Sequence, residues 1–277
     1  MTYSELQVTT HYSFLRGASS CEQLVATAAL LGMPALGIVD RNSVAGTVRA
    51  LRASEHVRED TGIDVRAIPG CRLDLVSGDS LLVWPEDRAA WSRLTSLLGI
   101  GKARADAQRG EKGKCFLHWE DLAARADGLV AALVADHVPD ARALRWMADL
   151  FGANGRGHVC LTHHRRPGDA LRLHETALAA EAHGLTPLAT GDVLYHHPSR
   201  RMLQDVVTAI REKTTIDALG FRRERHADRH LLPPDEMARR FRDHPRALGA
   251  VEAVVERCRF SLRDLTYQYP DEIVIPG

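Results

Sequence analysis

The chain has 277 residues, of which 45% are hydrophobic, and it carries 36 basic and 36 acidic side chains. This length can bury a large core, either in one α/β barrel of ordinary size or in two small domains, and we expect the single barrel-like domain. The formal net charge of zero excludes a protein held on nucleic acid or on a membrane by its overall field, so any contact with DNA must be local.

The five cysteines lie far apart and form no CxxC pair, and no apolar run approaches the roughly 18 residues that a membrane span requires. We therefore expect a cytoplasmic, reduced protein whose cysteines are buried or inert thiols, with a functional thiol as the weaker alternative. These cysteines are Cys21, Cys71, Cys115, Cys160 and Cys258.

The first 46 residues predict a strand, a loop, a helix and a second strand, which together make one βαβ unit. Ser20 can cap the helix, Gly32 and Pro34 end it, and the apolar run at residues 35–39 is typical of a buried parallel strand. Ligands bind at the carboxyl ends of such strands, so we expect the site at residues 9–11 and 40–42.

The same alternation continues to Pro198 and then changes. Apolar runs predict further strands at residues 65–70, 73–76, 80–84, 129–134, 158–161 and 187–190, with helices through 91–98 and 171–183. We expect a solvated polar loop at 102–114, with a phosphate contact as the alternative, and a turn at 152–157. Beyond Pro198 the pattern predicts helices at 202–211, 235–241 and 245–258, followed by a linker at 269–277. We therefore expect a barrel core over residues 1–198 and a helical extension over 199–277.

Five segments, in their order and spacing, resemble the amino-terminal PHP (polymerase and histidinol phosphatase) domain of C-family bacterial DNA polymerases. The match is closest to the error-prone, damage-inducible type of DNA polymerase III alpha subunit. This resemblance implies an α/β fold, a distorted (β/α)7 barrel whose mouth holds up to three metals in active members. It also implies that palm, fingers and thumb regions follow Gly277. The segments are LQVTTHYSFLRGAS (6–19), LGMPALGIVDRNSVAG (31–46), THHRRPGDA (162–170), GLTPLATGDVLYHHPSRRMLQDVVTAIREKTT (184–215) and LLPPDEMARRF (231–241).

Carried over residue by residue, the resemblance places poor metal ligands at most of the positions that bind metal in active members. A metal site needs three or four converging nitrogen, oxygen or sulfur ligands whose charge offsets that of the ion. We therefore predict a metal-free site in which arginine side chains replace the cations and pair with Asp40 and Asp192. The vestigial barrel-mouth site comprises Gln7, Thr9, Arg16, Asp40, Arg41, Arg72, Asp192 and Leu194, and Ser80 stands at one further ligand position.

The histidines leave one alternative open, a displaced metal site built from Asp192, His11 and His163. The pairs His163-His164 and His196-His197 support it weakly, because adjacent histidines on a strand or loop point to opposite sides. Polar rim histidines are the preferred interpretation. The sequence shows no nucleophile and base at a credible spacing and no Walker-type loop, so we assign no catalytic residue.

The function that the resemblance implies is that of a scaffold domain in an error-prone translesion DNA polymerase, which acts in damage-induced mutagenesis and DNA repair. Nucleotidyl transfer would belong to the absent palm, with Mg2+ as the cofactor of the parent polymerase and none in this chain. The expected partners are the palm and thumb domains, DNA through the parent, and accessory translesion proteins, with no membrane. The alternatives are a metal-dependent phosphoesterase or 3'-5' exonuclease, and a decayed copy with no role. Local DNA contacts are expected at Arg200, Arg201, Arg211 and Lys213, with a solvated or interdomain face as the alternative.

Overall fold

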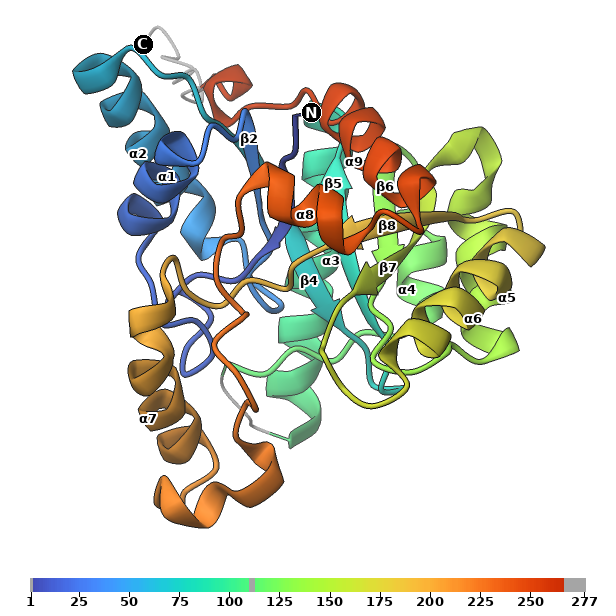
Figure 1. Ribbon diagram of the computed structural model, residues 1–277. Coiled ribbons are helices and arrows are strands. Elements are labelled where there is room, and N and C mark those ends of the chain that lie inside the picture. The colour runs from blue at the N-terminus through green and yellow to red at the C-terminus, as the bar shows by residue number, and fades with distance from the viewer. Residues whose placement is uncertain (1, 110–112, 267–277) are drawn as a thin grey trace, which may run out of the picture.

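The computed structural model describes residues 2–109 and 113–266 and shows two sheets with helices packed on both sides of them (Figure 1). One sheet has the order β1-β2-β3 and the other the order β4-β5-β6-β7-β8. The strands are β1 (Glu5–Val8), β2 (Ala35–Ile38), β3 (Arg66–Pro69), β4 (Cys71–Asp74), β5 (Ser80–Pro85), β6 (Leu129–Leu133), β7 (Gly157–Thr162) and β8 (Thr186–Thr190). The helices are α1 (Cys21–Leu30), α2 (Ala45–Thr61), α3 (Arg88–Arg109), α4 (Trp119–Ala123), α5 (Ala141–Met147), α6 (Asp169–Ala182), α7 (Arg201–Arg211), α8 (Pro234–Arg240) and α9 (Pro245–Arg257). The predicted α/β class is confirmed.

The amino-terminal βαβ unit forms as its sequence predicts. The Ser20 side chain accepts a hydrogen bond from the backbone N–H of Gln23, and the Gln23 side chain accepts one from Ser20, so α1 begins with a capping box. After α1, Gly32 adopts a φ of 70°, a conformation that glycine reaches without strain. Strands β1 and β2 then pair in parallel, which places Val8 opposite Ile38.

The two sheets meet at both ends without forming one continuous ladder in the described residues. Four of the strand pairs are parallel, whereas β5 is antiparallel to both β4 and β6. Isolated parallel bridges join Val8 to Val193 and Arg41 to Arg72. The chain passes from the first sheet to the second at Gly70, where a Cβ atom would lie 2.6 Å from Trp84 Cδ1. A closed seven-stranded barrel stays a prediction.

Strand β5 shows that the second sheet is buried on both faces. Leu82 and Trp84 belong to one core, with Leu6 of β1, while Leu81 and Val83 belong to the other. Side chains alternate between the two faces of a strand, so an unbroken apolar run is what a doubly covered strand requires.

Four helical regions differ from the expectations. Helices α2, α4 and α5 were not predicted, and α3 continues through residues 102–109, where we expected a loop. In α3, Arg104 makes two contacts with the Asp121 carboxylate, at 2.6 and 2.8 Å, and Ala105 is fully buried. Tertiary contacts therefore hold this polar stretch in a helix, against the local expectation.

Beyond Pro198, helices α7, α8 and α9 lie within one residue of the predicted ranges. A separate helical extension over 199–277 stays a prediction. Val251 and Val254 of α9 join the same core as Leu6, and α9 packs on β8. Within the described residues, every helix is too short or too polar to span a lipid bilayer. The linker predicted at residues 269–277 lies outside the described residues.

Gly37 allows β1 and β2 to pack closely, which gives a first testable prediction. A Cβ atom at this position would lie 2.6 Å from the Leu6 carbonyl oxygen and 2.9 Å from Leu6 Cα. The Gly37→Ala variant should therefore lower the free energy of unfolding by about 1–3 kcal/mol, measured by urea denaturation. Gly99→Ala is the matched control, because nothing lies within 4 Å of its added Cβ in helix α3. It should raise stability by about 0.5–1 kcal/mol, and equal losses in the two variants would contradict the prediction.

Candidate functional site

The structure brings the ends of β1, β2, β4 and β8 together through backbone hydrogen bonds. The N–H of Val193 donates to Gln7 at 2.8 Å, and the N–H of Thr9 donates to Val193 at 2.9 Å. On the other side, the N–H of Arg72 donates to the Asp40 carbonyl at 3.0 Å. These contacts bring residues 7–9, 40–41, 72 and 192–194 close together, and we call this region the mouth.

Asp192 lies in the mouth as the centre of a buried ion pair network. Its carboxylate contacts Arg229 Nη2 at 2.5 Å and Arg72 Nη1 at 3.8 Å, and the side chains of Asp192 and Arg72 are each 9% exposed. Burial by itself would raise the pKa of Asp192, but the guanidinium groups of Arg229 and Arg72 lower it below the usual value. Asp192 thus pairs with arginine as expected, although its nearer partner, Arg229, was not predicted for this site.

Asp74 was also missed, and it joins two of the predicted arginines. Arg41 Nη1 lies 2.6 Å from its carboxylate and Arg72 Nε lies 3.3 Å away, while the Ser80 hydroxyl donates a further hydrogen bond. Burial opposes ionisation of Asp74, but the two arginines lower its pKa. The available signal was its position two residues after Arg72 on β4, which puts both side chains on one face of the strand.

The predicted pairing of Asp40 with arginine is wrong. Its buried carboxylate accepts hydrogen bonds from the Thr10 N–H at 2.9 Å, the Thr10 hydroxyl at 2.9 Å and the Ser13 hydroxyl at 2.7 Å. The adjacent Arg41 side chain extends instead to Asp74. Burial raises the pKa of Asp40, and these hydrogen bonds oppose the rise. Asp40 therefore holds the loop after β1 in place.

Arg16 adds positive charge to the mouth. Its guanidinium is half-buried, and burial together with the charges of Arg41 and Arg211 lowers its pKa to about 10. Its loop is tied to α7, because Gln204 Nε2 donates to the Arg16 carbonyl at 2.8 Å and Arg211 Nη1 donates to the Leu15 carbonyl at 2.9 Å.

The remaining vestigial residues offer neither a carboxylate nor an imidazole to a metal ion. Gln7 and Thr9 are buried, and the Gln7 side-chain amide has no hydrogen-bond partner in the described structure. Leu194 contributes backbone contacts, accepting from the N–H of Ala18 at 2.8 Å. Across residues 2–109 and 113–266, no group of three His, Cys, Asp or Glu side chains is placed to hold a metal ion. The donor set of the mouth does not fit the metal cluster that active PHP sites imply.

The histidines of the displaced-site alternative bind separate partners. His11 Nδ1 lies 3.1 Å from the Ser19 carbonyl oxygen, and His163 Nε2 lies 2.9 Å from that of Arg240. His164 Nε2 lies 3.3 Å from Asp136 Oδ1, and His196 Nδ1 lies 2.8 Å from the Ser19 hydroxyl. Adjacent histidines thus reach different parts of the chain, and the described structure does not gather His11, His163 and Asp192 into one metal-binding group.

Two of the four residues expected to contact DNA, Arg201 and Arg211, have side chains that bind other parts of this chain. Arg201 contacts Asp205 at 2.9 Å and donates to the His226 carbonyl at 2.6 Å. Arg211 is held by Leu15, as described above. Lys213 is exposed and Arg200 is half-buried. The role of these residues in DNA binding stays a prediction.

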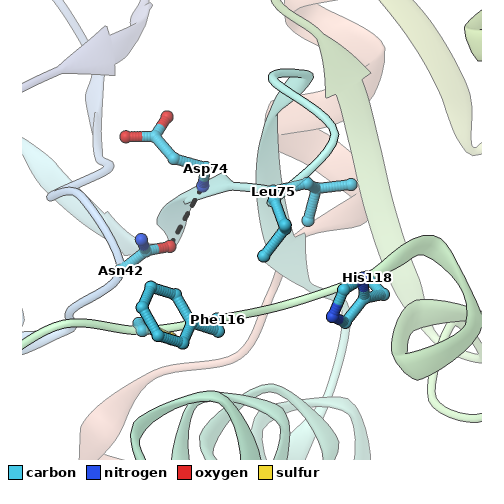
Figure 2. A pocket seen from close by; sticks show the side chains of 7 residues that line it. Asn42, Asp74, Leu75, Phe116 and His118 are labelled. Carbon is cyan, nitrogen blue, oxygen red and sulfur yellow. Dashed lines mark hydrogen bonds between the residues drawn. The ribbon is translucent and has the colours of Figure 1, made fainter. Parts of the chain in front are cut away.

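A cavity of about 390 Å³ lies beside Asp74 and is lined by Asn42, Leu75, Val76, Cys115, Phe116 and His118 (Figure 2). The Asn42 side-chain oxygen accepts a hydrogen bond from the Asp74 N–H at 3.0 Å. In Figure 2, the Asp74 carboxylate points away from Leu75 and His118. The cavity therefore adjoins the ion pairs of the mouth, but its lining includes none of the predicted vestigial residues.

Glu5 is buried and lies two residues before Gln7 on β1, so both side chains lie on the same face of the strand. Its carboxylate accepts hydrogen bonds of 2.8 Å each from the Tyr3 hydroxyl and from the N–H groups of Gln7 and Gly191. Burial raises the pKa of Glu5 to about 7 despite these three donors. Glu5 thus connects β1 to the residue that precedes Asp192.

Comparisons with known proteins agree with the family resemblance of the sequence. The PHP domain profile matches residues 5–219. The chain is 54% identical over 280 residues to Error-prone DNA polymerase 3 of Agrobacterium fabrum, and 54% identical over 279 residues to Error-prone DNA polymerase 2 of Rhizobium meliloti. Each alignment covers 100% of this chain but only 24% of the relative, so the chain spans about a quarter of the length of these relatives.

A crystal structure from Bifidobacterium adolescentis, assigned as a metal-dependent phosphoesterase, is similar with a TM-score of 0.51. It is 14% identical in sequence, and the match covers 69% of this chain and 87% of that one. At this identity the likeness concerns the fold alone.

Removal of Arg229 should destabilise the protein strongly. Among the described residues, the Arg229→Met variant leaves Arg72, 3.8 Å away, as the remaining ion-pair partner of the buried Asp192, so the free energy of unfolding should fall by about 3 kcal/mol. Arg239 is the matched control, because it is 65% exposed and paired with Glu236, and Arg239→Met should cost less than about 0.5 kcal/mol. Adding Asp192→Asn to Arg229→Met should recover part of the loss in urea denaturation; losses that simply add would contradict the coupling.

Glu5 should make stability fall as pH rises from about 4.5 to about 7, because the folded chain keeps a proton that the unfolded chain releases. The contribution approaches about 1.4 kcal/mol per pH unit in this window. His158 acts in the opposite direction, since burial lowers its pKa to about 4. The test is therefore the difference in unfolding free energy between wild type and Glu5→Gln at several pH values. Glu252→Gln, on the exposed face of α9, serves as the control. A difference that does not change with pH would refute the assignment.

Proposed function

The chain belongs to the PHP domain family, and from this premise we propose that it is the PHP domain of an error-prone C-family DNA polymerase, where it acts as a metal-free structural scaffold. The observation that carries the first half is the 54% identity over the whole chain to error-prone polymerases about four times as long. Nucleotide transfer with Mg2+, DNA binding and translesion synthesis in the cytoplasm would then belong to the longer protein.

The metal-free half of the proposal rests on the ion pairs of the mouth. Arg229 Nη2 lies 2.5 Å from Asp192 Oδ2, so a cation that bound this oxygen would have to displace Arg229. It would also meet the charges of Arg72 and Arg41. At an effective dielectric constant of about 20, one unit charge about 4 Å away repels a divalent ion by about 8 kcal/mol. The arginines thus neutralise the carboxylates that a metal would otherwise bind.

The finer fold follows from the same premise. We propose that the two sheets form the two parts of a distorted (β/α)7 barrel, with the bridges at Val193 and Arg72 as its seams. In this arrangement the mouth stands where active family members hold their metals. The arginine–carboxylate contacts would close the barrel mouth, so that the scaffold keeps its shape without ions.

The alternative function is a metal-dependent phosphoesterase or a 3'-5' exonuclease. Its support is the fold likeness alone, and a fold does not carry chemistry without its site. Gln7, Thr9, Arg16, Arg41 and Arg72 supply neither carboxylate nor imidazole at the positions where that chemistry needs metal ligands.

The experiment measures bound metal and phosphodiester hydrolysis on the purified protein supplied with zinc or manganese. We expect less than about 0.1 metal ion per chain by elemental analysis and no hydrolysis of a nitrophenyl phosphodiester or of a single-stranded DNA 3' end above that of Asp192→Ala. Stoichiometric metal, together with hydrolysis that Asp192→Ala abolishes, would replace the scaffold with the phosphoesterase. DNA synthesis by the full-length chain tests the polymerase assignment separately.

A further inference from the structure

Helix α7 turns its apolar side outward, which is the reverse of the usual arrangement in a surface helix. Its buried residues are Gln204, Asp205, Thr208 and Ala209. Its exposed residues include Met202 at 59%, Leu203 at 40%, Val206 at 36% and Ile210 at 57% of their full accessibility. We call these four exposed side chains the α7 patch. Figure 1 shows α7 extending away from the two sheets, at the lower left.

Specific polar contacts fix the rotation of α7, so the helix cannot simply turn to bury the patch. The Asp205 carboxylate is 2% exposed and pairs with Arg201 at 2.9 Å and with Arg223 at 2.8 Å. Gln204 and Arg211 bind the backbone of the loop at residues 15–16. Rolling the helix would leave a buried carboxylate and two carbonyl groups without their partners, which is unfavourable because buried polar groups need partners.

Two exposed aromatic side chains lie on segments that adjoin α7. Phe14, which is 84% exposed, belongs to the loop that Gln204 and Arg211 hold. Phe221 is 98% exposed in the short helical turn Asp217–Arg222, which follows α7. Single exposed apolar residues are common, but four on one helix face, with two exposed phenylalanines on segments connected to that helix, are typical of a surface that a partner covers.

We propose that the α7 patch is the docking surface for the rest of the polymerase chain, which is absent from this structure. This inference rests on the proposed function. The matched relatives are about four times as long as this chain, so such a polymerase has a large surface available to cover α7. Apolar side chains that are held outward suit a permanent contact within one protein and not a phosphate backbone.

The charges around α7 favour this occupant over a second copy of the chain. Basic side chains outnumber acidic ones between residues 200 and 225, and Lys213, Arg222 and Arg225 are exposed. Two copies facing each other through α7 would bring these like charges together, which opposes association. The covering surface should therefore be apolar at its centre and acidic at its rim.

The test uses the full-length polymerase chain with a photo-crosslinking benzoylphenylalanine at Val206, or at Leu178 as the control. Leu178 is 53% exposed on α6, so both probes start from apolar exposed helix positions. We expect cross-links from position 206 to residues of the same chain outside these 277, with a yield at least tenfold above that from position 178. Cross-links between two copies, or equal yields from both positions, would overturn the proposal.

A second pair of variants addresses the patch itself, with the benzoylphenylalanine probe at Met202. Val206→Asn with Ile210→Asn should reduce the cross-linked fraction at least tenfold, whereas Leu171→Asn with Leu178→Asn on α6 should leave it unchanged. An unchanged fraction in the α7 variant would overturn the docking surface. If the full-length chain synthesises DNA while α7 gives no cross-link, only this inference fails; if the gene encodes no further polymerase chain, the proposed function fails with it.

Discussion

Arg72 holds the two sheets together at the mouth, through its guanidinium and its backbone. It lies between Asp74, 3.3 Å away on its own strand, and Asp192, 3.8 Å away beyond β8. Its backbone bridges to Arg41 at the end of β2. The guanidinium of Arg72 therefore connects β4 to the residue that follows β8, its backbone connects β4 to the segment after β2, and Arg229 completes the neutralisation of Asp192. Buried charges persist only when they are paired in this way, because their desolvation is otherwise too costly.

Next to the ion pairs, hydrogen bonds from hydroxyl and N–H groups to two further carboxylates hold the loops of the mouth in place. Asp40 binds Thr10 and Ser13 in place of an arginine, and so fixes the loop after β1. Gly46 lies against this carboxylate so closely that a Cβ atom would be 2.3 Å from Asp40 Oδ2. Glu5 likewise fixes the residue before Asp192, because its carboxylate accepts a hydrogen bond from the Gly191 N–H. These contacts do for the loops what metal coordination does elsewhere: they bring the strand ends to fixed positions.

The mouth and α7 are connected by direct contacts. The loop that carries Arg16 into the mouth is held by Gln204 and Arg211, which belong to α7. The polar side of α7 is thus occupied by contacts inside the domain, and this leaves its apolar side for contacts outside. Helix α7 therefore both holds the loop of Arg16 and presents the α7 patch.

The sequence by itself determined many of the local elements and the family. The apolar run of β2, the capping box at Ser20 and the helices after Pro198 are set by interactions between near neighbours, and they lie where the pattern predicts. The match to the PHP domain over residues 5–219 follows from the same landmarks.

Only the tertiary structure decided the partners of the charged groups and the faces of the helices. Arg229 reaches Asp192 from 37 residues further along the chain, a contact that no local spacing encodes. Asp40 was expected to bind arginine and instead binds hydroxyl groups, because neighbouring side chains on an extended segment diverge and Arg41 extends to Asp74. Helix α3 continues through its polar end because Asp121 binds Arg104. The period of α7 predicts an amphipathic helix, but which side faces inward depends on Asp205 meeting Arg223, and that contact exists only after the chain has folded.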